Sequence, residues 1–235
     1  MTPDLRISPQ SLASADLFLG IPTPVLEIVA AAARPRRAPS GARIFNQGDE
    51  GVRAHVVIEG GVRISQSGSD GSQVVLRFIG PGAIFGTVAM FTDGRYPADA
   101  TAVAATLEAS WSESELMALM TRYPQIAINT IRIIGLRLQE VQDRVRELAT
   151  QGADRRIAHA LVRLARQSGH STAAGMTIFF PLRRKDVADV AGTTLHTASR
   201  ILTGWEKAGL LISRRRRLTI RNTSKLLRIA EEGRN

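Results

Sequence analysis

The 235-residue chain contains no cysteine. This absence excludes disulfides, thiolate zinc sites, cysteine nucleophiles and cysteine-ligated iron–sulfur clusters. Long apolar runs are also missing, because the longest, from Pro24 to Ala33, is too short to cross a bilayer. The segment from Met1 to Gln10 lacks the basic and apolar parts of a secretion signal. We therefore expect a cytoplasmic protein without a membrane partner.

Groupings typical of enzyme active sites are scarce as well. The sequence has no histidines paired at metal-ligand spacing and no serine in a recognisable nucleophile motif. Gly80 to Gly86, with the sequence GPGAIFG, superficially resembles a dinucleotide-binding fingerprint, but its spacing is wrong and it opens no helix. We expect a turn there, no metal site, and a protein that is not an enzyme.

Positive charge is concentrated in one part of the chain. Residues 152–235 hold 17 lysines and arginines against 6 acidic residues, whereas residues 1–151 hold 14 against 15. Such an excess is typical of a module that neutralises phosphates, although a basic segment can also be merely solvated. The charge therefore favours double-stranded DNA as a partner, and the length allows a separate domain for it.

The region from Arg36 to Ser112 contains short apolar segments separated by glycines, which is typical of a small antiparallel barrel or roll. Helices are expected before it, at Leu12–Phe18 and Pro24–Ala33. The predicted strands are Ala42–Asn46, His55–Glu59, Val62–Gln66, Gln73–Ile79 and Ala100–Ser110. The sequence thus predicts a β-roll domain over residues 1–122.

A long helix is predicted from Pro124, whose missing N–H suits a first turn. Apolar residues recur in it at alternating spacings of three and four, and charged residues flank them, as in a coiled-coil seam. The seam residues are Ile131, Ile134, Leu138, Val141, Val145 and Leu148. We expect residues 123–151 to pair with a second copy of the chain, the alternative being packing against their own domain.

Gln151 and Gly152 interrupt that helix, and residues 152–235 form the predicted DNA-binding domain. Asp154 is the expected N-cap of a helix that reaches about Ser168. A polar loop is expected from Gln167 to Ala174, followed by a short strand at Thr177–Phe180.

Residues 183–211 contain two helical periodicities separated by a glycine. Val187 and Val190 share one face of the first helix, Gly192 can supply a turn with positive φ, and Thr193 or Thr194 can cap the second helix. The predicted core face of the second helix consists of Leu195, Ala198, Ile201, Leu202 and Trp205. This arrangement predicts a helix-turn-helix.

Polar residues on the second helix can reach base edges or phosphates from the major groove of DNA. Ile212 to Ile220 predicts a two-stranded wing with four arginines at its tip, whose mutual repulsion favours a polyanion as ligand. The predicted DNA-binding residues are Arg183, Arg184, Lys185, Thr194, His196, Thr197, Ser199, Arg200, Arg214, Arg215, Arg216 and Arg217.

This stretch resembles the winged helix-turn-helix of the cyclic-AMP receptor and fumarate/nitrate regulator (CRP/FNR) superfamily. IFNQGD (Ile44–Asp49), HVVIEGGVRI (His55–Ile64) and GPGAIFGTVAMF (Gly80–Phe91) resemble its cyclic-nucleotide-binding β-roll, and the heptad helix resembles its dimerisation helix. The resemblance implies an α+β chain with a β-roll, a long helix and a C-terminal winged helix-turn-helix. It further implies a homodimeric transcription regulator with a palindromic operator and RNA polymerase as a further partner.

In that superfamily a glutamate and an arginine of the recognition helix read the half-site, and the matching positions are His196 and Arg200. Arginine can bind guanine O6 and N7 in a bidentate manner. Because a neutral histidine can donate or accept where a glutamate only accepts, we expect the half-site to differ in detail.

Cyclic-nucleotide binders of this superfamily place a glutamate and an arginine where this chain has Thr87 and Pro97. A buried cyclic phosphate needs a cation, whereas Asp99 would repel it and Arg95 is the only nearby basic residue. The pattern therefore does not favour cyclic AMP. The effector pocket that the resemblance implies consists of Gly86, Thr87, Pro97, Ala98, Val141 and Gln142.

What the β-roll senses stays open: haem, another small ligand, or no ligand at all. We assign none of His55, His159 and His170 as a haem ligand. Thr194–Thr197 resembles the nitrite and nitric oxide reductase regulator branch, which implies control of nitric oxide, denitrification or low-oxygen metabolism genes. Two alternatives are a small-ligand sensor module that acts on a protein partner, and an effector-independent regulator controlled by its abundance.

Overall fold

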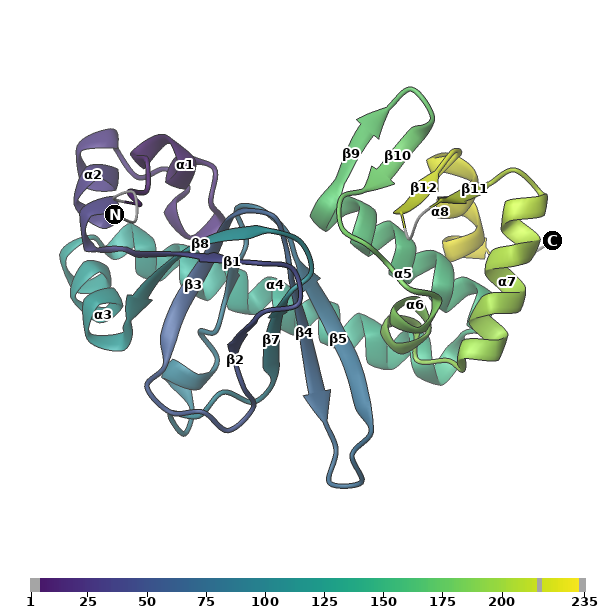
Figure 1. Ribbon diagram of the computed structural model, residues 1–235, viewed down its shortest axis with the longest axis horizontal. Helices are drawn as coiled ribbons and strands as arrows, with labels where there is room; N and C mark the ends of the chain where they lie inside the picture. The colour runs from purple at the N-terminus through teal and green to yellow at the C-terminus, as the bar shows by residue number, and fades with distance from the viewer. Residues whose placement is uncertain (1–4, 215–216, 233–235) are drawn as a thin grey trace. The chain divides into compact units, whose positions relative to one another are not determined.

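The computed structural model describes residues 5–214 and 217–232. Their contacts divide the chain into two compact units. The first comprises Met1–Ser72 and Ile79–Glu140, and the second comprises Gln73–Phe78 and Val141–Asn235. Figure 1 labels the helices and strands of both units.

The strands of the first unit form two sheets, with the orders β1-β8-β3-β6 and β2-β7-β4. Most of β5, the strand that follows β4 in the chain, is assigned to the second unit. The pairings β1–β8, β3–β8, β3–β6, β2–β7 and β4–β7 are antiparallel. The strands are β1 (Arg34–Ala38), β2 (Arg43–Phe45), β3 (Arg53–Glu59), β4 (Val62–Ser67), β5 (Gln73–Ile79), β6 (Ile84–Phe85), β7 (Asp99–Ala102) and β8 (Thr106–Ser112). The predicted antiparallel architecture of this region is confirmed.

Helices cover one side of the first sheet. They are α1 (Pro9–Ala13), the 3-10 helix η1 (Asp16–Phe18), α2 (Thr23–Ala32), α3 (Glu113–Arg122) and the first turns of α4 (Pro124–Thr150), while a second 3-10 helix, η2 (Ala89–Phe91), follows β6. Trp111 of β8 is fully buried among them. Its indole Nε1 donates to the Val29 carbonyl at 3.0 Å, and the Phe18 ring meets it edge-on at 5.3 Å. Another apolar core, which includes Val57 and Phe85, joins the strands of the two sheets.

The second unit combines helices with a small sheet of order β11-β12-β10-β9. Its elements are α5 (Ala153–Ser168), β9 (Gly169–Thr172), β10 (Gly175–Ile178), α6 (Arg184–Ala191), α7 (Leu195–Lys207), β11 (Leu211–Arg214), β12 (Arg217–Ile220) and α8 (Thr223–Glu232). The largest buried side chains of this unit are Trp205, Phe78 and Phe180. The predicted winged helix-turn-helix is therefore present.

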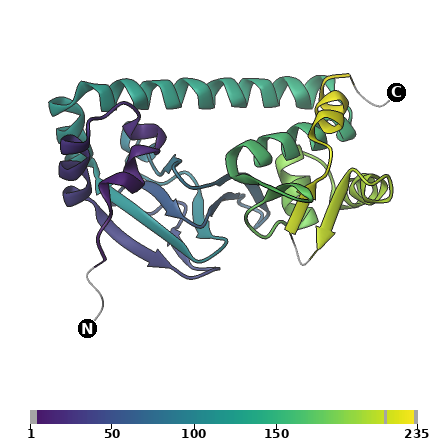
Figure 2. The same ribbon diagram turned by 90° about the horizontal axis from the view of Figure 1, so that it is seen from above.

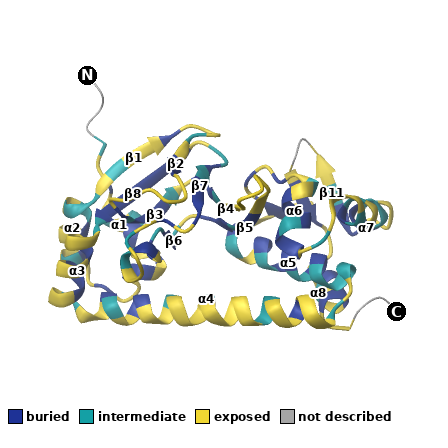
Figure 3. Cartoon of the chain, turned by 90° about the horizontal axis from the view of Figure 1, so that it is seen from below, coloured by how far each residue is buried: buried dark blue, intermediate teal, exposed yellow. Residues whose placement is uncertain are grey.

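Helix α4 runs without a break from Pro124 to Thr150, as Figure 2 shows, and its predicted start and end are confirmed. Most of its surface is exposed (Figure 3), and the six predicted seam side chains are 44% to 70% exposed. Pairing of this seam with a second copy stays a prediction. Within the described ranges, no helix has both the length and the apolar character needed to span a membrane.

Several boundary predictions were wrong. The helix expected at Leu12–Phe18 is two short elements, α1 and the 3-10 helix η1. The strand expected at Ala100–Ser110 is two strands, β7 and β8, which belong to different sheets. Gly152 rather than Asp154 is the N-cap of α5, and Asp154 lies in the first turn, where its charge suits the helix dipole. The segment from Gln167 to Ala174 is not a simple loop, because β9 forms within it and pairs with β10.

Besides η2 and β9, the elements that were not predicted are β1, β6, α3 and α8. The sequence of β1 is basic and contains Pro35, which is acceptable because β1 is an edge strand. Helix α3 begins with a capping box, in which the Glu115 carboxylate accepts from the Ser112 N–H at 2.6 Å and the Ser112 hydroxyl accepts from the Glu115 N–H at 3.3 Å. That Ser-x-x-Glu pattern is readable in the sequence and could have located α3.

A buried carboxylate attaches the last turns of α4 to α5. Glu147 is 4% exposed, and its Oε1 lies 2.7 Å from Nη1 of Arg163 and 3.7 Å from Nδ1 of His159. Burial lowers the pKa of His159, which favours its neutral form. The cation that pairs most closely with Glu147 is therefore Arg163.

We expect Arg163→Met to lower the free energy of unfolding by about 2 kcal/mol or more, because it leaves a buried carboxylate without its guanidinium. The matched control is Arg146→Met, which removes a pair with Asp143 whose two side chains are both more than half exposed. That variant should lose about 0.5 kcal/mol or less. Urea unfolding at one fixed protein concentration measures both changes, and equal losses would contradict the expectation.

Candidate nucleic-acid interface

The turn between α6 and α7 depends on a glycine. Gly192 adopts φ 62° and ψ 46°, the left-handed conformation, and ends α6. A Cβ at this position would collide with the Leu148 side chain from α4. Arg156 of α5 donates to the carbonyls of Ala191 at 3.0 Å and Gly192 at 3.1 Å. The predicted glycine turn is thus confirmed, and α4 and α5 hold it in place.

Helix α7 is capped by Thr194, whose Oγ1 accepts from the Thr197 N–H at 3.1 Å. Of the two predicted caps, Thr193 and Thr194, it is therefore Thr194 that begins the helix. Four of the five residues predicted to face the core are buried: Ala198, Ile201, Leu202 and Trp205. The prediction for Leu195 was wrong, since its side chain is 49% exposed at the first position of α7, one turn before the packed face begins.

The opposite face of α7 presents the residues predicted to read DNA. His196 and Arg200 are exposed one turn apart, with the half-buried Thr197 and Ser199 beside them. Within the part of the chain that the structure describes, neither His196 nor Arg200 makes a side-chain hydrogen bond or ion pair. Their donors are therefore available to a ligand.

Arg184 has a different environment. Its Nη1 donates to the Ser199 carbonyl at 2.8 Å and to Oγ1 of Thr203 at 2.7 Å, and its Nη2 pairs with Glu206 at 2.8 Å. These bonds engage the guanidinium inside the motif, so we assign Arg184 to holding α7 on α6 rather than to DNA. Nothing in the sequence pattern distinguished it from its exposed neighbour Arg183.

Two other predicted contacts lie at the start of α6. Arg183 is exposed and precedes the helix, and its backbone N–H donates to Asp186 at 2.8 Å. Lys185 is exposed, and its Nζ lies 2.9 Å from Asp189 one turn later. Because the Lys185 ammonium is mostly exposed and has three donors, it can also reach a phosphate while it stays next to Asp189.

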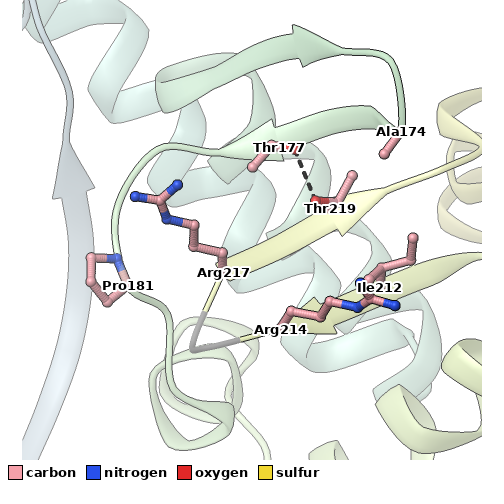
Figure 4. Close-up of a pocket in the computed structure, with 7 residues that line it drawn as sticks. All are labelled: Ala174, Thr177, Pro181, Ile212, Arg214, Arg217 and Thr219. Atoms are coloured by element: carbon pink, nitrogen blue, oxygen red, sulfur yellow. Dashed lines mark hydrogen bonds between the residues drawn. The ribbon is translucent and has the colours of Figure 1, made fainter.

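The wing consists of β11 and β12. Arg214 and Arg217 are direct partners across these strands and are both exposed, and Figure 4 shows the two side chains. Arg215 and Arg216, which were also predicted to bind DNA, lie outside the described residues. Leu211, Leu218 and Ile220 fill the core on the other face of the strands. The wing therefore carries its free cations on one side.

The predicted effector residues are divided between the units. Gly86 has φ +81° after β6, and the buried Thr87 follows it, with its Oγ1 3.5 Å from Nη1 of Arg137. Pro97 is exposed and Ala98 is buried. The remaining two, Val141 and Gln142, are exposed residues of the second unit.

The charges near this turn do not suit a phosphate. The Asp99 carboxylate is buried, accepts from the Gln47 N–H at 2.9 Å and lies 3.3 Å from Nη1 of Arg43. Arg95 pairs on the surface with Glu50. The position thus keeps a buried anion near Pro97, and the guanidinium that reaches Thr87 is that of Arg137 from α4.

His55 is a buried residue with both ring nitrogens engaged. Its Nδ1 lies 2.5 Å from Oε2 of Glu108, and its Nε2 lies 3.2 Å from the Tyr96 hydroxyl. The ring stacks on Phe85 at 4.8 Å. This environment does not fit an axial haem ligand and supports a structural role. Among residues 5–214 and 217–232, no group of three or more histidine or acidic side chains could hold a metal ion.

Two family models match the chain. The model described as "Cyclic nucleotide-binding domain" matches residues 35–123, and the one described as "Crp-like helix-turn-helix domain" matches residues 155–229. The chain is 30% identical over 195 residues to the Cyclic AMP receptor protein of Thermus thermophilus, covering 83% of this chain and 87% of that protein. It is 31% identical over 205 residues to the Nitrogen fixation regulation protein FixK of Azorhizobium caulinodans, covering 86% and 82%.

Two solved structures are similar to the chain over most of its length. The Thermus thermophilus Catabolite Activator Protein is 29% identical, with a TM-score of 0.54 and coverage of 94% of this chain and all of that one. FixK2 from Bradyrhizobium japonicum is 24% identical, with a TM-score of 0.72 and coverage of 83% and 96%, which supports the fold.

We expect cyclic AMP not to bind this chain, because the exposed Pro97 stands where the resemblance calls for an arginine and the buried Asp99 would repel the phosphate. Isothermal titration with cyclic AMP tests this, with the Thermus thermophilus relative named Cyclic AMP receptor protein as the positive control. Saturable binding with a dissociation constant of about 1 mM or lower, which corresponds to a binding free energy of about −4 kcal/mol, would contradict the expectation.

Proposed function

The chain belongs to the CRP/FNR family of DNA-binding transcription regulators, and from this premise we propose that it acts as a homodimer that recognises a palindromic operator. The observation that carries the proposal is the exposed face of α7, where His196 and Arg200 lie without internal partners next to a helix-turn-helix that Gly192 and Thr194 define.

In this proposal Arg200 reads a guanine through its O6 and N7, and His196 contacts a neighbouring base. Phosphate or base contacts are also provided by Arg183, Lys185, Thr194, Thr197 and Ser199. The wing arginines add contacts to phosphates. Sequence preference then depends on very few side chains, while affinity depends on many.

The dimer is proposed from the surface of α4. Its seam residues form one apolar row whose side chains are 44% to 70% exposed, and a coiled coil with a second copy would bury it. A two-fold dimer places its recognition helices about 34 Å apart, in successive major grooves. The operator should therefore consist of two inverted half-sites.

Regulation is proposed to act through the relative populations of two conformations of the protein. A signal received in the β-roll would shift an existing equilibrium between forms that differ in DNA affinity, with RNA polymerase as the partner that senses the bound form. Helix α4 supports this idea, since its first turns belong to one unit and its last turns to the other.

Selection of bound sequences from a pool of randomised duplexes tests the operator. We expect a palindrome, and we expect Arg200→Ala to reduce its preference over random DNA by about 5- to 150-fold, equivalent to about 1 to 3 kcal/mol. Arg228→Ala, which removes an exposed arginine of α8, is the matched control. Recovery of no motif would favour the alternative of a sensor that acts on a protein partner.

We propose further that the regulated genes serve nitric oxide, denitrification or low-oxygen metabolism. The Thr194–Thr197 resemblance supports this, as does the similarity to a relative named as a nitrogen fixation regulator. A reporter behind the selected operator should change its expression with nitric oxide or oxygen limitation only in cells that make the wild-type protein, with Arg200→Ala as the control. Constant expression would favour control by abundance.

A further inference from the structure

Helix α4 has an inner face that contacts its own chain. In the first unit this face begins with the buried Ile126 and Thr130 and continues with Ile133, which packs against the apolar core beneath the first sheet. Arg137 follows on the same face, about one turn further on. A charged side chain therefore continues a face that begins with apolar packing.

The guanidinium of Arg137 binds the turn that follows β6. Its Nη2 donates to the carbonyl of Ile84, and its Nη1 lies 3.5 Å from Oγ1 of the buried Thr87. Between these residues Gly86 has φ +81°, and a Cβ there would lie 2.6 Å from the carbonyl oxygen of Arg53, so the turn lies tightly against β3. Arg137 thus joins α4 to a part of the β-roll that is itself held in place.

Further along, the inner face of α4 contacts the second unit. Arg144, about two turns after Arg137, donates to the carbonyls of Leu76 at 3.2 Å and Asp189 at 2.9 Å. Both of these residues belong to the second unit, and the part of α4 that belongs to the first unit ends at Glu140. Arg137 therefore binds the first unit close to the point where α4 passes to the second.

The seam of α4 lies directly beside this inner face. Ile134 follows Ile133 in the helix and Leu138 follows Arg137, and consecutive residues of an α-helix are about 100° apart around its axis. The two seam side chains are 44% and 58% exposed. The place at which the guanidinium is held therefore fixes the rotation of α4 about its axis, and with it the residues that α4 presents to a second copy.

We propose that Arg137 is a positioning residue through which the β-roll sets the rotation of α4, and so the register in which two copies pair. The inference rests on the proposed homodimer and adds to it the side chain that connects the turn after β6 with the paired helices. A signal that displaces this turn would rotate α4 through the guanidinium. The separation of the two recognition helices, and with it the preferred spacing of the half-sites, would then change.

Because the chain has no cysteine, single cysteines can report the rotation of α4. Ile134→Cys places a thiol in the seam, and Gly135→Cys places one on its flank, where a Cβ meets no atom within 4 Å. In a two-fold parallel pair, a seam residue faces its own copy, so mild oxidation links the two chains there. The rate of linking is measured in the full-length chain for wild type, Arg137→Met and Arg137→Lys. Arg132→Met removes an exposed arginine of the same helix and is the matched control.

We expect wild type and Arg132→Met to link faster at position 134 than at position 135. In Arg137→Met this preference should fall by about 10-fold, because hydrogen bonds to a charged group are lost. Arg137→Lys keeps a cation that can donate to a carbonyl, and it should restore part of the preference. A variant that is only less stable would change both rates alike and leave their ratio as in wild type.

A second measurement uses the spacing of the half-sites. The affinity for the selected operator is compared with that for duplexes in which one base pair is inserted or removed between the half-sites. We expect wild type and Arg132→Met to discriminate against both altered duplexes. Arg137→Met should discriminate less, because a helix that is free to rotate can present its recognition helices at several separations.

Two outcomes would overturn the inference. If Arg137→Met keeps the cysteine preference and the spacing preference of wild type, the guanidinium does not set the rotation, while the proposed homodimer stands. If wild type forms no linked dimer at position 134 and binds DNA without regard to spacing, the proposed homodimer fails, and the role of Arg137 fails with it.

Discussion

Glu147 can remain in the interior of the second unit only while Arg163 compensates its charge, and much of the arrangement of that unit follows from this pair. The pair ties the end of α4 to α5, and the next residue, Leu148, lies against Gly192 at the turn of the helix-turn-helix. Arg144, one turn earlier, donates to the carbonyl of Asp189 at 2.9 Å. The end of α4 and the turn before α7 are thus positioned by one set of contacts.

The basic residues of the second unit divide into two groups with different roles. Arg156, Arg163 and Arg184 donate to carbonyls or carboxylates inside the unit and stabilise it. Arg200 and Arg217 have no such partners in the described ranges and face outward. Because only the second group can release counterions from DNA, the net charge of this region overstates the number of phosphates that it can neutralise.

The sequence was most informative where one local pattern sufficed. Gly192, Thr194 and the α7 core residues were predicted because a left-handed turn, a cap and a helical period each leave a local pattern. Arg184 and Glu147 were not, because their roles come from residues up to 22 positions away. Strand β1 was missed for the same reason, since pairing with β8, far along the chain, makes a basic segment with a proline into a strand.

The buried pair of His55 and Glu108 has a consequence for how the β-roll forms. The two side chains come from neighbouring strands, with His55 opposite Ser110 and Val57 opposite Glu108. Sliding one strand by a residue would turn its member of the pair to the other face and separate a buried acid from its polar partner. Misaligned pairings of β3 and β8 therefore carry an energetic penalty, so this polar pair fixes the register of two otherwise largely apolar strands.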